Sequence, residues 1–370
     1  MIHYLWQDRD WPNFRWDASA LLEPLGTCRK AQGQLLAHVA DLGLPLANQS
    51  HAEILIEETI KTSAIEGNLL DARSVRSSVA RRLGLPYAGL PVDHRVDDLV
   101  AVLLDATEHY AAPLTAERLW GWQAALFPGG YSGLHRIKVG GWRDSGEPMC
   151  VVSGPIGRER VHFEAPPSER LDVEMRQFLA WFGSSLGRTE GLLRAALAHL
   201  WFVTIHPFDD GNGRIARALT DMALAQDDRQ PARYLSLSTQ IMAERDSYYA
   251  ILEATQKGSC DVTVWLIWFL DCYARAVQRS AALLDGVFQR AEFWRRNAQV
   301  PLTDRQRKVV NRLLEAGPDG FEGGMTTRKY AALTGASRAT AFRELDQLHA
   351  AGVLLRSGQG RSVRYDLARP

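Results

Sequence analysis

One twelve-residue stretch carries side chains suited to chemistry on a phosphate group: His206-Pro207-Phe208-Asp209-Asp210-Gly211-Asn212-Gly213-Arg214-Ile215-Ala216-Arg217. Pro207 disfavours α geometry at His206, so a helix before it must end there and leave the imidazole on a loop. An imidazole with an ordinary pKa of about 6.5 is neutral often enough near pH 7 to act as a general base. Proton abstraction from an attacking hydroxyl is therefore within its reach.

The residues after this histidine predict an anion-binding helix start. A helix that begins near Gly211 to Gly213 offers unpaired backbone N–H groups and the positive end of its dipole, and glycines let an anion approach closely. Arg214 and Arg217 are three residues apart, so they lie on one face of that helix. Asp210 is unexpected beside phosphate unless a divalent cation bridges the two, as Mg²⁺ commonly does. The pattern predicts Mg²⁺ with a di- or triphosphate.

This stretch resembles the Fic-domain signature, His-x-Phe-x-Asp/Glu-Gly-Asn-Gly-Arg-x-x-Arg, at every specified position. The resemblance covers roughly residues 1 to 290 and implies a protein adenylyltransferase, which transfers AMP from ATP to a hydroxyl side chain of a target protein. It implies His206 as general base, Phe208 as a core anchor and Asp210 as the Mg²⁺ ligand. It implies a nucleotide site made of Gly211, Asn212, Gly213, Arg214 and Arg217.

A second resemblance lies at the end of a predicted helix over residues 51 to 66. That helix is expected from the capping-box form of Ser50-x-x-Glu53, apolar residues at every fourth position and a stop at Gly67-Asn68. Its last turn, Thr62 to Gly67, is similar to the family's inhibitory motif, Ser/Thr-x-x-x-Glu-Gly/Asn. The resemblance implies that Glu66 inhibits the enzyme by occupying Arg217, the arginine that a γ-phosphate needs.

Two further parts of the site follow from the same resemblance. The Gly- and Val-rich segment from Gly129 to Pro167 predicts a β-hairpin. Fic proteins use such a flap to bind an extended target segment by strand addition, which implies Val151, Val152 and Ser153 as the target-binding edge. Family members hold the adenosine end where Tyr249 and Gln256 fall, although some have Asn at the second position.

The elements that must position these residues are mainly α-helical. The chain has 370 residues, 46% hydrophobic and 23% charged, typical of a folded protein with two or three domains. Helical spacing of apolar residues recurs over residues 21–42, 189–205, 213–226, 248–254 and 262–284. We expect a helical N-terminal region over residues 1–110, a Fic core with the flap over residues 111–297, and a third domain over residues 298–370.

The last seventy residues predict a winged helix-turn-helix domain. Helices are expected over residues 304–316, 327–334 and 337–350, followed by a Gly-rich strand pair over residues 353–367. From residue 301 on, twelve Lys and Arg outnumber seven Asp and Glu, a net charge of +5. Residues 337–364 could then bind DNA, with the recognition helix starting at Ser337 and Arg356, Arg361 and Arg364 near phosphates. The alternative is a dimerisation or target-docking module, since winged helices serve in these roles too.

Composition limits the remaining classes. The formal net charge is +0, so no global field draws the chain to nucleic acid or membrane. The longest apolar run, Val262 to Leu270, is too short to span a membrane, and the first residues lack a signal-peptide layout, so we expect a cytoplasmic location. Four cysteines without a Cys-x-x-Cys pair argue against zinc and disulfides.

Three alternatives stay open at this point. The chain could be a transcription regulator whose Fic-like part senses nucleotide while the winged helix reads DNA. It could remove AMP from modified proteins, with Glu66 orienting a water molecule, because the same residues serve both directions. It could also form a homodimer that adjusts the contact between Glu66 and Arg217.

Overall fold

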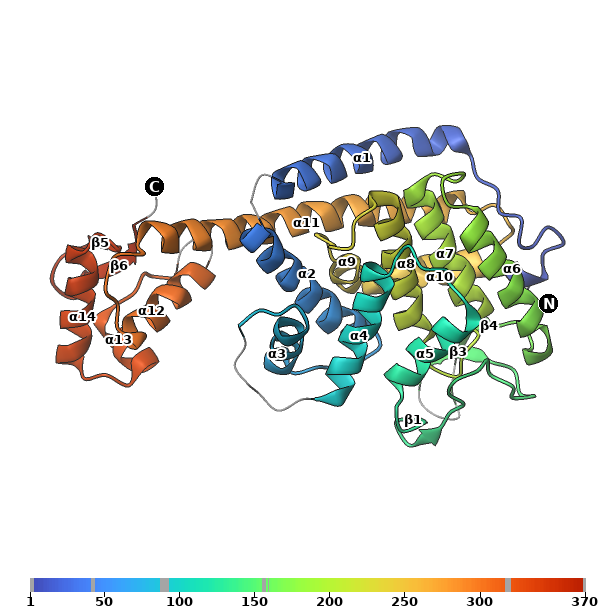
Figure 1. Cartoon of the computed structure of the whole chain (residues 1–370), viewed down its shortest axis with the longest axis horizontal. Helices are drawn as coiled ribbons and strands as arrows, with labels where there is room; N and C mark the ends of the chain where they lie inside the picture. The colour runs from blue at the N-terminus through green and yellow to red at the C-terminus, as the bar shows by residue number, and fades with distance from the viewer. Residues whose placement is uncertain are drawn as a thin grey trace. The chain divides into compact units, whose positions relative to one another are not determined.

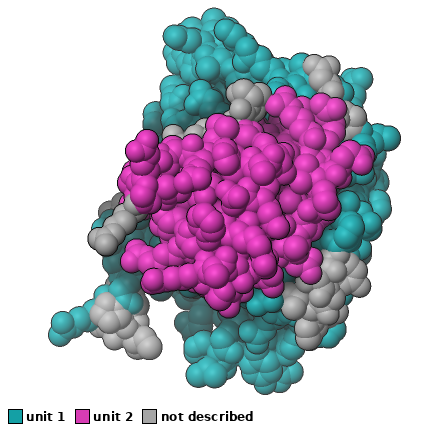
Figure 2. Space-filling model, turned by 90° about the vertical axis from the view of Figure 1, so that its left-hand side faces the viewer, with its two compact units in different colours: residues 1–281 teal, residues 282–370 magenta. Residues whose placement is uncertain are grey.

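The structure is a computed structural model that describes residues 3–40, 44–86, 93–154, 158, 160–316 and 321–368, without the side chains of Glu315 and Arg361. Arg361, predicted to lie near phosphates on the wing, therefore falls outside the described side chains. The chain divides into two compact units, residues 1–281 and 282–370, coloured separately in Figure 2. The predicted boundaries at residues 110 and 297 stay predictions.

The first unit is helical, as the sequence predicts (Figure 1). Its helices run in the order η1 (Leu5–Gln7), α1 (Ala18–Ala40), α2 (Leu44–Ile65), α3 (Ala72–Arg82), α4 (His94–Glu108), α5 (Ala116–Leu126), η2 (Ser168–Arg170), α6 (Leu171–Ser184), α7 (Gly191–Ile205), α8 (Asn212–Asp228), α9 (Leu237–Ala243) and α10 (Arg245–Gln256). Helix α11 (Thr263–Arg296) begins in this unit and crosses the division at residue 281. No described helix is long and apolar enough to cross a bilayer.

Helix α7 forms the centre of this unit. Every residue from Leu192 to Ile205 is buried, as expected for a helix that is apolar on all sides. Its principal neighbour is α8, and Trp265 of α11 donates its indole N–H to the Ala196 carbonyl at 3.0 Å. The loop between α7 and α8 is thus held between two well-packed helices, which gives the residues on it a rigid support.

Helix α2 begins earlier than predicted. It starts at Leu44 and not at residue 51, so the expected capping box at Ser50 and Glu53 is wrong. Ser50 lies inside the helix, fully buried, and its hydroxyl has no hydrogen-bond partner. Pro45 is compatible with this earlier start, because a first helical turn does not need its N–H. Helix α2 packs against α3, α4, α8 and α9, which carries its end toward α8.

The strands form small antiparallel hairpins. The predicted flap is confirmed as β3 (Cys150–Ser153) paired with β4 (Arg160–Glu164), with a bulge between Val151 and Val152. At its base, Phe163 and Ala165 pack with Tyr4 and Trp6 near the N-terminus to form an aromatic cluster. A second hairpin, β1 (Tyr131–Ser132) with β2 (His135–Arg136), was not predicted.

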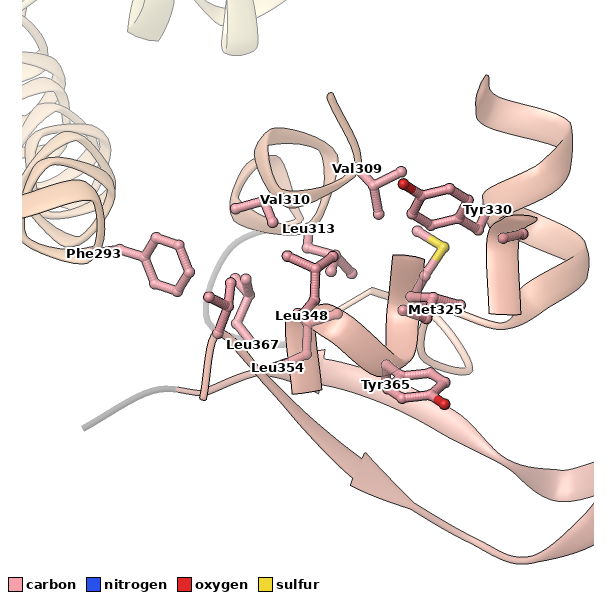
Figure 3. Close-up of a cluster of buried hydrophobic side chains, with 13 residues drawn as sticks. Phe293, Val309, Val310, Leu313, Met325, Tyr330, Leu348, Leu354, Tyr365 and Leu367 are labelled. Atoms are coloured by element: carbon pink, nitrogen blue, oxygen red, sulfur yellow. The ribbon is translucent and has the colours of Figure 1, made fainter. Parts of the chain in front are cut away.

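The second unit has its own core (Figure 3). Its elements are α12 (Asp304–Glu315), α13 (Thr327–Thr334), α14 (Arg338–Ala350), β5 (Leu354–Ser357), η3 (Gly360–Ser362) and β6 (Arg364–Leu367), and β5 pairs antiparallel with β6. Val309, Tyr330, Leu348 and Tyr365 meet in the core from three helices and the hairpin. The order of three helices and a hairpin agrees with the prediction for this region.

Candidate active site at the start of α8

His206 ends α7 in a left-handed conformation, with φ 51° and ψ 59°. Its ring Nδ1 lies 3.2 Å from the Val203 carbonyl oxygen, so this nitrogen carries the proton and Nε2 is left as the acceptor. Burial is the main cause that lowers the pKa of His206 to about 4; the Arg143 charge acts in the same direction, while the Val203 carbonyl, Glu66 and Asp210 oppose the shift. The imidazole is therefore neutral at physiological pH, as a general base must be.

The loop after His206 is held by its own side chains. Phe208 is fully buried and its ring lies 5.2 Å from that of Trp142, which agrees with the core role that the resemblance implied. Asn212 accepts from the Phe208 N–H at 3.0 Å and donates to the Phe208 carbonyl at 2.7 Å. Because its side chain is used in this way, a phosphate contact from Asn212 would have to come from its backbone N–H.

The first turn of α8 has hydrogen-bond donors for an anion. Gly211 has φ 93°, and a Cβ added there would lie 2.9 Å from the Phe127 ring. The Nε of Arg214 and the Nη1 of Arg217 are both buried without a hydrogen-bond partner. Buried unpartnered donors are rare in folded proteins and need an explanation, and here they lie beside free helix amides. This donor set fits the phosphates of a nucleotide.

Glu66 occupies part of this anion site. Its Oε1 accepts from Arg217 Nη2 at 2.7 Å, and a Cβ added to Gly213 would lie 2.2 Å from the same oxygen. Arg217 also donates to the Thr62 hydroxyl at 2.7 Å and to the Thr62 carbonyl at 2.9 Å. Burial lowers the pKa of Arg217, but the Glu66 carboxylate more than offsets this and leaves it raised. The sequence-predicted pair of Glu66 and Arg217 is thus present.

Tyr249 and Gln256 lie close to the site but contact protein atoms. The Tyr249 hydroxyl donates to the Ile65 carbonyl at 3.4 Å, and Arg245, stacked on the Tyr249 ring, donates to the same oxygen at 3.0 Å. Gln256 is buried and donates to the Val203 carbonyl and the Thr204 hydroxyl at 3.4 and 3.3 Å. Tyr249 therefore helps to hold the end of α2, and the adenosine contacts of both residues stay predictions.

Asp210 directly precedes Gly211 at the start of α8, and 42% of its side chain is exposed. It accepts from the Gly211 N–H at 2.5 Å and from the Ser132 hydroxyl of the β1–β2 hairpin, and Arg214 lies 3.7 Å away. Among the described residues no group of three or more His, Cys, Asp and Glu could hold a metal. One carboxylate suits Mg²⁺ only together with phosphate oxygens and water, which are its usual partners.

The flap presents an open strand edge near the site. In the part of the chain that the structure describes, β3 pairs only with β4, so its other edge has free backbone groups. Val152 is 49% exposed, whereas Val151 packs on the aromatic cluster at the flap base. The Ser153 hydroxyl lies 2.6 Å from His162 Nε2, whose other ring nitrogen lies 2.6 Å from Glu253 of α10. The flap is therefore tied to the helical body.

Sequence reasoning missed three residues that the structure brings to this site. Ser132 contacts Asp210, Arg245 contacts the end of α2, and Arg143 donates to the His206 carbonyl at 2.8 Å. None lies within a periodic segment or a motif, so no local signal marks them. Thr62 did have a signal, because it is the first residue of the inhibitory motif.

Three histidines, of which His199 is buried and His51 and His206 are half-buried, make the stability depend on pH. Burial lowers the pKa of His51 and His206 to about 4 and of His199 to about 3, below the ordinary 6.5. Their contribution to stability is present above pH 6.5 and is lost as pH falls, because the unfolded chain binds their protons first. We expect the free energy of unfolding to fall by up to about 4 kcal/mol per pH unit between pH 6 and 4.5, at about 1.4 for each histidine.

Urea unfolding at pH 7, 6, 5 and 4.5 tests this expectation. His199→Gln should reduce the slope by about one proton, because burial and the Arg217 charge keep His199 neutral between the Thr220 and Tyr248 hydroxyls, at 3.0 and 2.8 Å. An unfolding free energy that does not change between pH 7 and 4.5 would contradict it.

The chain is similar to known proteins. The family model of the Fic/DOC family matches residues 113–224, and that of a domain of unknown function, DUF4172, matches residues 4–85. The chain is 26% identical over 247 residues to a protein adenylyltransferase Fic of Aedes aegypti, covering 65% of this chain and 44% of the relative. It is 32% identical over 135 residues to a uridine 5'-monophosphate transferase of Xanthomonas campestris, covering 33% of this chain and 23% of that one.

Solved structures show the same fold. A Fic family protein from Desulfovibrio desulfuricans aligns with a TM-score of 0.56 at 20% identity, covering 95% of this chain and 96% of that one. Residues 134–508 of Fic-1 from C. elegans align with a TM-score of 0.50 at 20% identity, covering 72% and 73%. The chain spans less than half the length of the two mosquito adenylyltransferases that it matches. The family match over residues 113–224, which include the histidine loop and the glycine-lined start of α8, shows that this segment of the chain is a Fic domain.

Proposed function

We propose that this chain is a protein adenylyltransferase that transfers AMP from ATP to a Ser, Thr or Tyr hydroxyl of a target protein or of itself. We propose further that Glu66 inhibits it by competing for Arg217. The observation that carries this proposal is the Glu66–Arg217 pair beside two unpartnered buried donors, Arg214 Nε and Arg217 Nη1. The relatives named protein adenylyltransferase Fic support the class of reaction.

The residues have distinct roles in the proposed reaction. The Nε2 of His206 takes the proton of the acceptor hydroxyl as its oxygen attacks the α-phosphorus. The bond from the α-phosphorus to the oxygen bridging the α- and β-phosphates breaks, and diphosphate leaves toward Arg214 and Arg217. Asp210 would hold Mg²⁺, which supplies neutralisation of the phosphate charges. The backbone N–H groups of residues 212 and 213 would bind the α-phosphate, together with that of Gly211 once it leaves the Asp210 carboxylate.

Glu66 has the charge and the place of a competing anion. Its carboxylate lies over Gly213, at the positive end of α8, and bonds one nitrogen of Arg217. A γ-phosphate directed at Arg217 would meet a like charge there and would have to displace the carboxylate. In this proposal the paired form binds ATP weakly or in an unproductive pose, and release of Glu66 gives the active form.

Intact mass spectrometry of wild type and Glu66→Gly after incubation with Mg²⁺ and ATP tests the proposal. A parallel incubation with UTP is included, because one relative is named a uridine 5'-monophosphate transferase. We expect an AMP adduct on Glu66→Gly. Only a UMP adduct would correct the nucleotide, and no adduct from a protein that binds ATP would overturn the transfer reaction.

Two open alternatives are tested with the same material. Removal of AMP by the wild type predicts that label placed by Glu66→Gly disappears when unlabelled wild type is added. A homodimer that adjusts the Glu66 contact predicts that activity per molecule changes on dilution. Activity that is independent of concentration would count against the dimer.

DNA binding by the second unit is the other candidate function, supported by the charges on one helix and the hairpin. Arg338 and Arg343 are exposed on α14, with Phe342 at 52% exposure between them, and Arg356 and Arg364 are exposed on β5 and β6. Cationic side chains at the start of a recognition helix and on a wing are the usual phosphate contacts of winged helices.

We expect the full chain to bind a random-sequence duplex at low salt, with affinity that falls steeply as salt rises. Replacing both Arg338 and Arg343 with Ala should weaken binding and reduce the salt slope by about two. Fluorescence anisotropy at two or more salt concentrations measures this, with Arg9→Ala of the first unit, also exposed, as the matched control. Binding that the double variant leaves unchanged would remove this helix from any DNA contact.

A further inference from the structure

Arg143 is a buried cation that the proposed reaction has not yet used. Only 3% of the residue is exposed, and it lies in the segment that joins α5 and the flap. Its Nε donates to the His206 carbonyl at 2.8 Å, its backbone N–H donates to the Pro207 carbonyl at 2.9 Å, and its Nη2 donates to the Pro166 carbonyl. One residue thus holds three backbone oxygens of two separate segments.

We infer that Arg143 is a positioning residue, which holds His206 in its strained conformation and keeps the catalytic loop in register with the flap. This inference rests on the proposed function, because it concerns the base and the acceptor of that same reaction. All of the hydrogen bonds described for Arg143 go to backbone carbonyls and none to the imidazole ring, so it positions His206 through the backbone.

The conformation of His206 explains why a donor is needed there. A non-glycine residue with φ 51° is in the left-handed region, which costs free energy unless the surroundings hold it. The next residue is a proline without an N–H, so the backbone here offers the carbonyls of His206 and Pro207 as acceptors but no donor at residue 207. Arg143 contacts both oxygens.

The other end of the guanidinium reaches the base of the flap. Pro166 follows β4 by two residues, and the preceding Ala165 donates its N–H to the Met149 carbonyl at 2.9 Å. Trp142, next to Arg143, packs on Phe208 of the catalytic loop and on Trp120 of α5. Arg143 therefore helps to set the distance between His206 and a target strand that is added to β3.

The charge of Arg143 also acts on the base. It lowers the pKa of His206 in addition to burial, while the carboxylates of Glu66 and Asp210 and the Val203 carbonyl raise it. A neutral replacement should therefore raise the pKa of His206, so that the base loses its activity at a higher pH. Lysine would keep the charge but would lose the planar fork that bonds two carbonyls at once.

The test compares Arg143→Gln and Arg143→Lys, each in the Glu66→Gly background. Arg194→Gln is the matched control, because Arg194 is also buried and donates to a backbone carbonyl, that of Phe182 at 2.6 Å, far from the loop. Self-labelling from ATP is measured as kcat/KM against pH, and the His206 imidazole is titrated by NMR. Thermal unfolding reports the stability of each variant.

Arg143→Gln should reduce kcat/KM by about 100-fold, as expected for a misplaced reacting group. The fall of kcat/KM at acid pH should also begin at a higher pH. Arg143→Lys should also have a reduced kcat/KM, but kcat/KM should fall at the same acid pH as in the Glu66→Gly parent, because the charge is kept. Arg194→Gln should lower the melting temperature without changing either readout. If Arg143→Gln does not fold, full activity of Arg143→Lys overturns the inference.

The outcomes separate this inference from the proposed function. No labelling by Glu66→Gly itself means that the proposed function has failed, and the NMR titration then still reports whether Arg143 acts on His206. Labelling by Glu66→Gly that Arg143→Gln leaves unchanged in rate and pH dependence means that the positioning role is wrong. If Arg143→Gln is slower but has the same pH dependence as the control, Arg143 has only a structural role and the inference is wrong.

Discussion

Replacing Glu66 with glycine is expected to raise AMP transfer by roughly 10- to 150-fold at subsaturating ATP. The pair of Glu66 and Arg217 is 2.7 Å long, the Arg217 side chain is only 2% exposed and that of Glu66 is 30% exposed, so water screens the pair only in part. A hydrogen bond between charged groups contributes about 1.5–3 kcal/mol. Each 1.4 kcal/mol, approximately, is tenfold in an equilibrium, which gives the expected range. Initial rates of transfer from α-labelled ATP measure the effect.

Matched variants separate two effects of Glu66→Gly, the loss of the carboxylate charge and the introduction of a glycine at the end of the helix. Glu66→Gln keeps the size of the side chain and should activate to a similar degree, whereas Glu57→Gln, on the same helix, should not activate. Arg217 keeps its two contacts to Thr62 in all of them. An unchanged rate in both Glu66 variants, with ATP affinity also unchanged, would show that the pair does not limit the reaction.

Replacing His206 with alanine in the activated Glu66→Gly protein should reduce transfer by about 10²- to 10⁴-fold, the usual contribution of a general base. The proton on Nδ1 is held at the Val203 carbonyl, which leaves Nε2 as the only acceptor on the ring. ATP affinity should change little, because the phosphate donors come from α8. Single-turnover labelling and equilibrium ATP binding measure the two quantities separately.

The pH dependence provides a second check on His206. Because burial holds its pKa near 4, kcat/KM should stay level from about pH 8 down to 5 and fall only below that. His109→Ala is a suitable control, since His109 is an exposed surface partner of Asp105. Equal transfer by Glu66→Gly with and without His206 would remove the histidine from the chemistry.

The sequence by itself determined the parts of the site that depend on neighbouring residues. The loop from His206 to Arg217 was predictable because Pro207 ends a helix, Gly211 takes a left-handed φ of 93°, and the arginines follow at helical spacing. Most helices, the flap and the order of elements in the second unit were predictable from periodicity. Local hydrogen bonding and apolar spacing decide all of these features.

The tertiary structure decided which distant side chains meet. Glu66 and Arg217 are 151 residues apart, Ser132 and Asp210 are 78 apart, and Arg143 and His206 are 63 apart. Only the first pair was predictable, through a family motif and not through spacing. The lowered pKa of His206 likewise depends on burial by several elements. Partners and burial arise from packing of the whole unit, and no local pattern in the sequence encodes them.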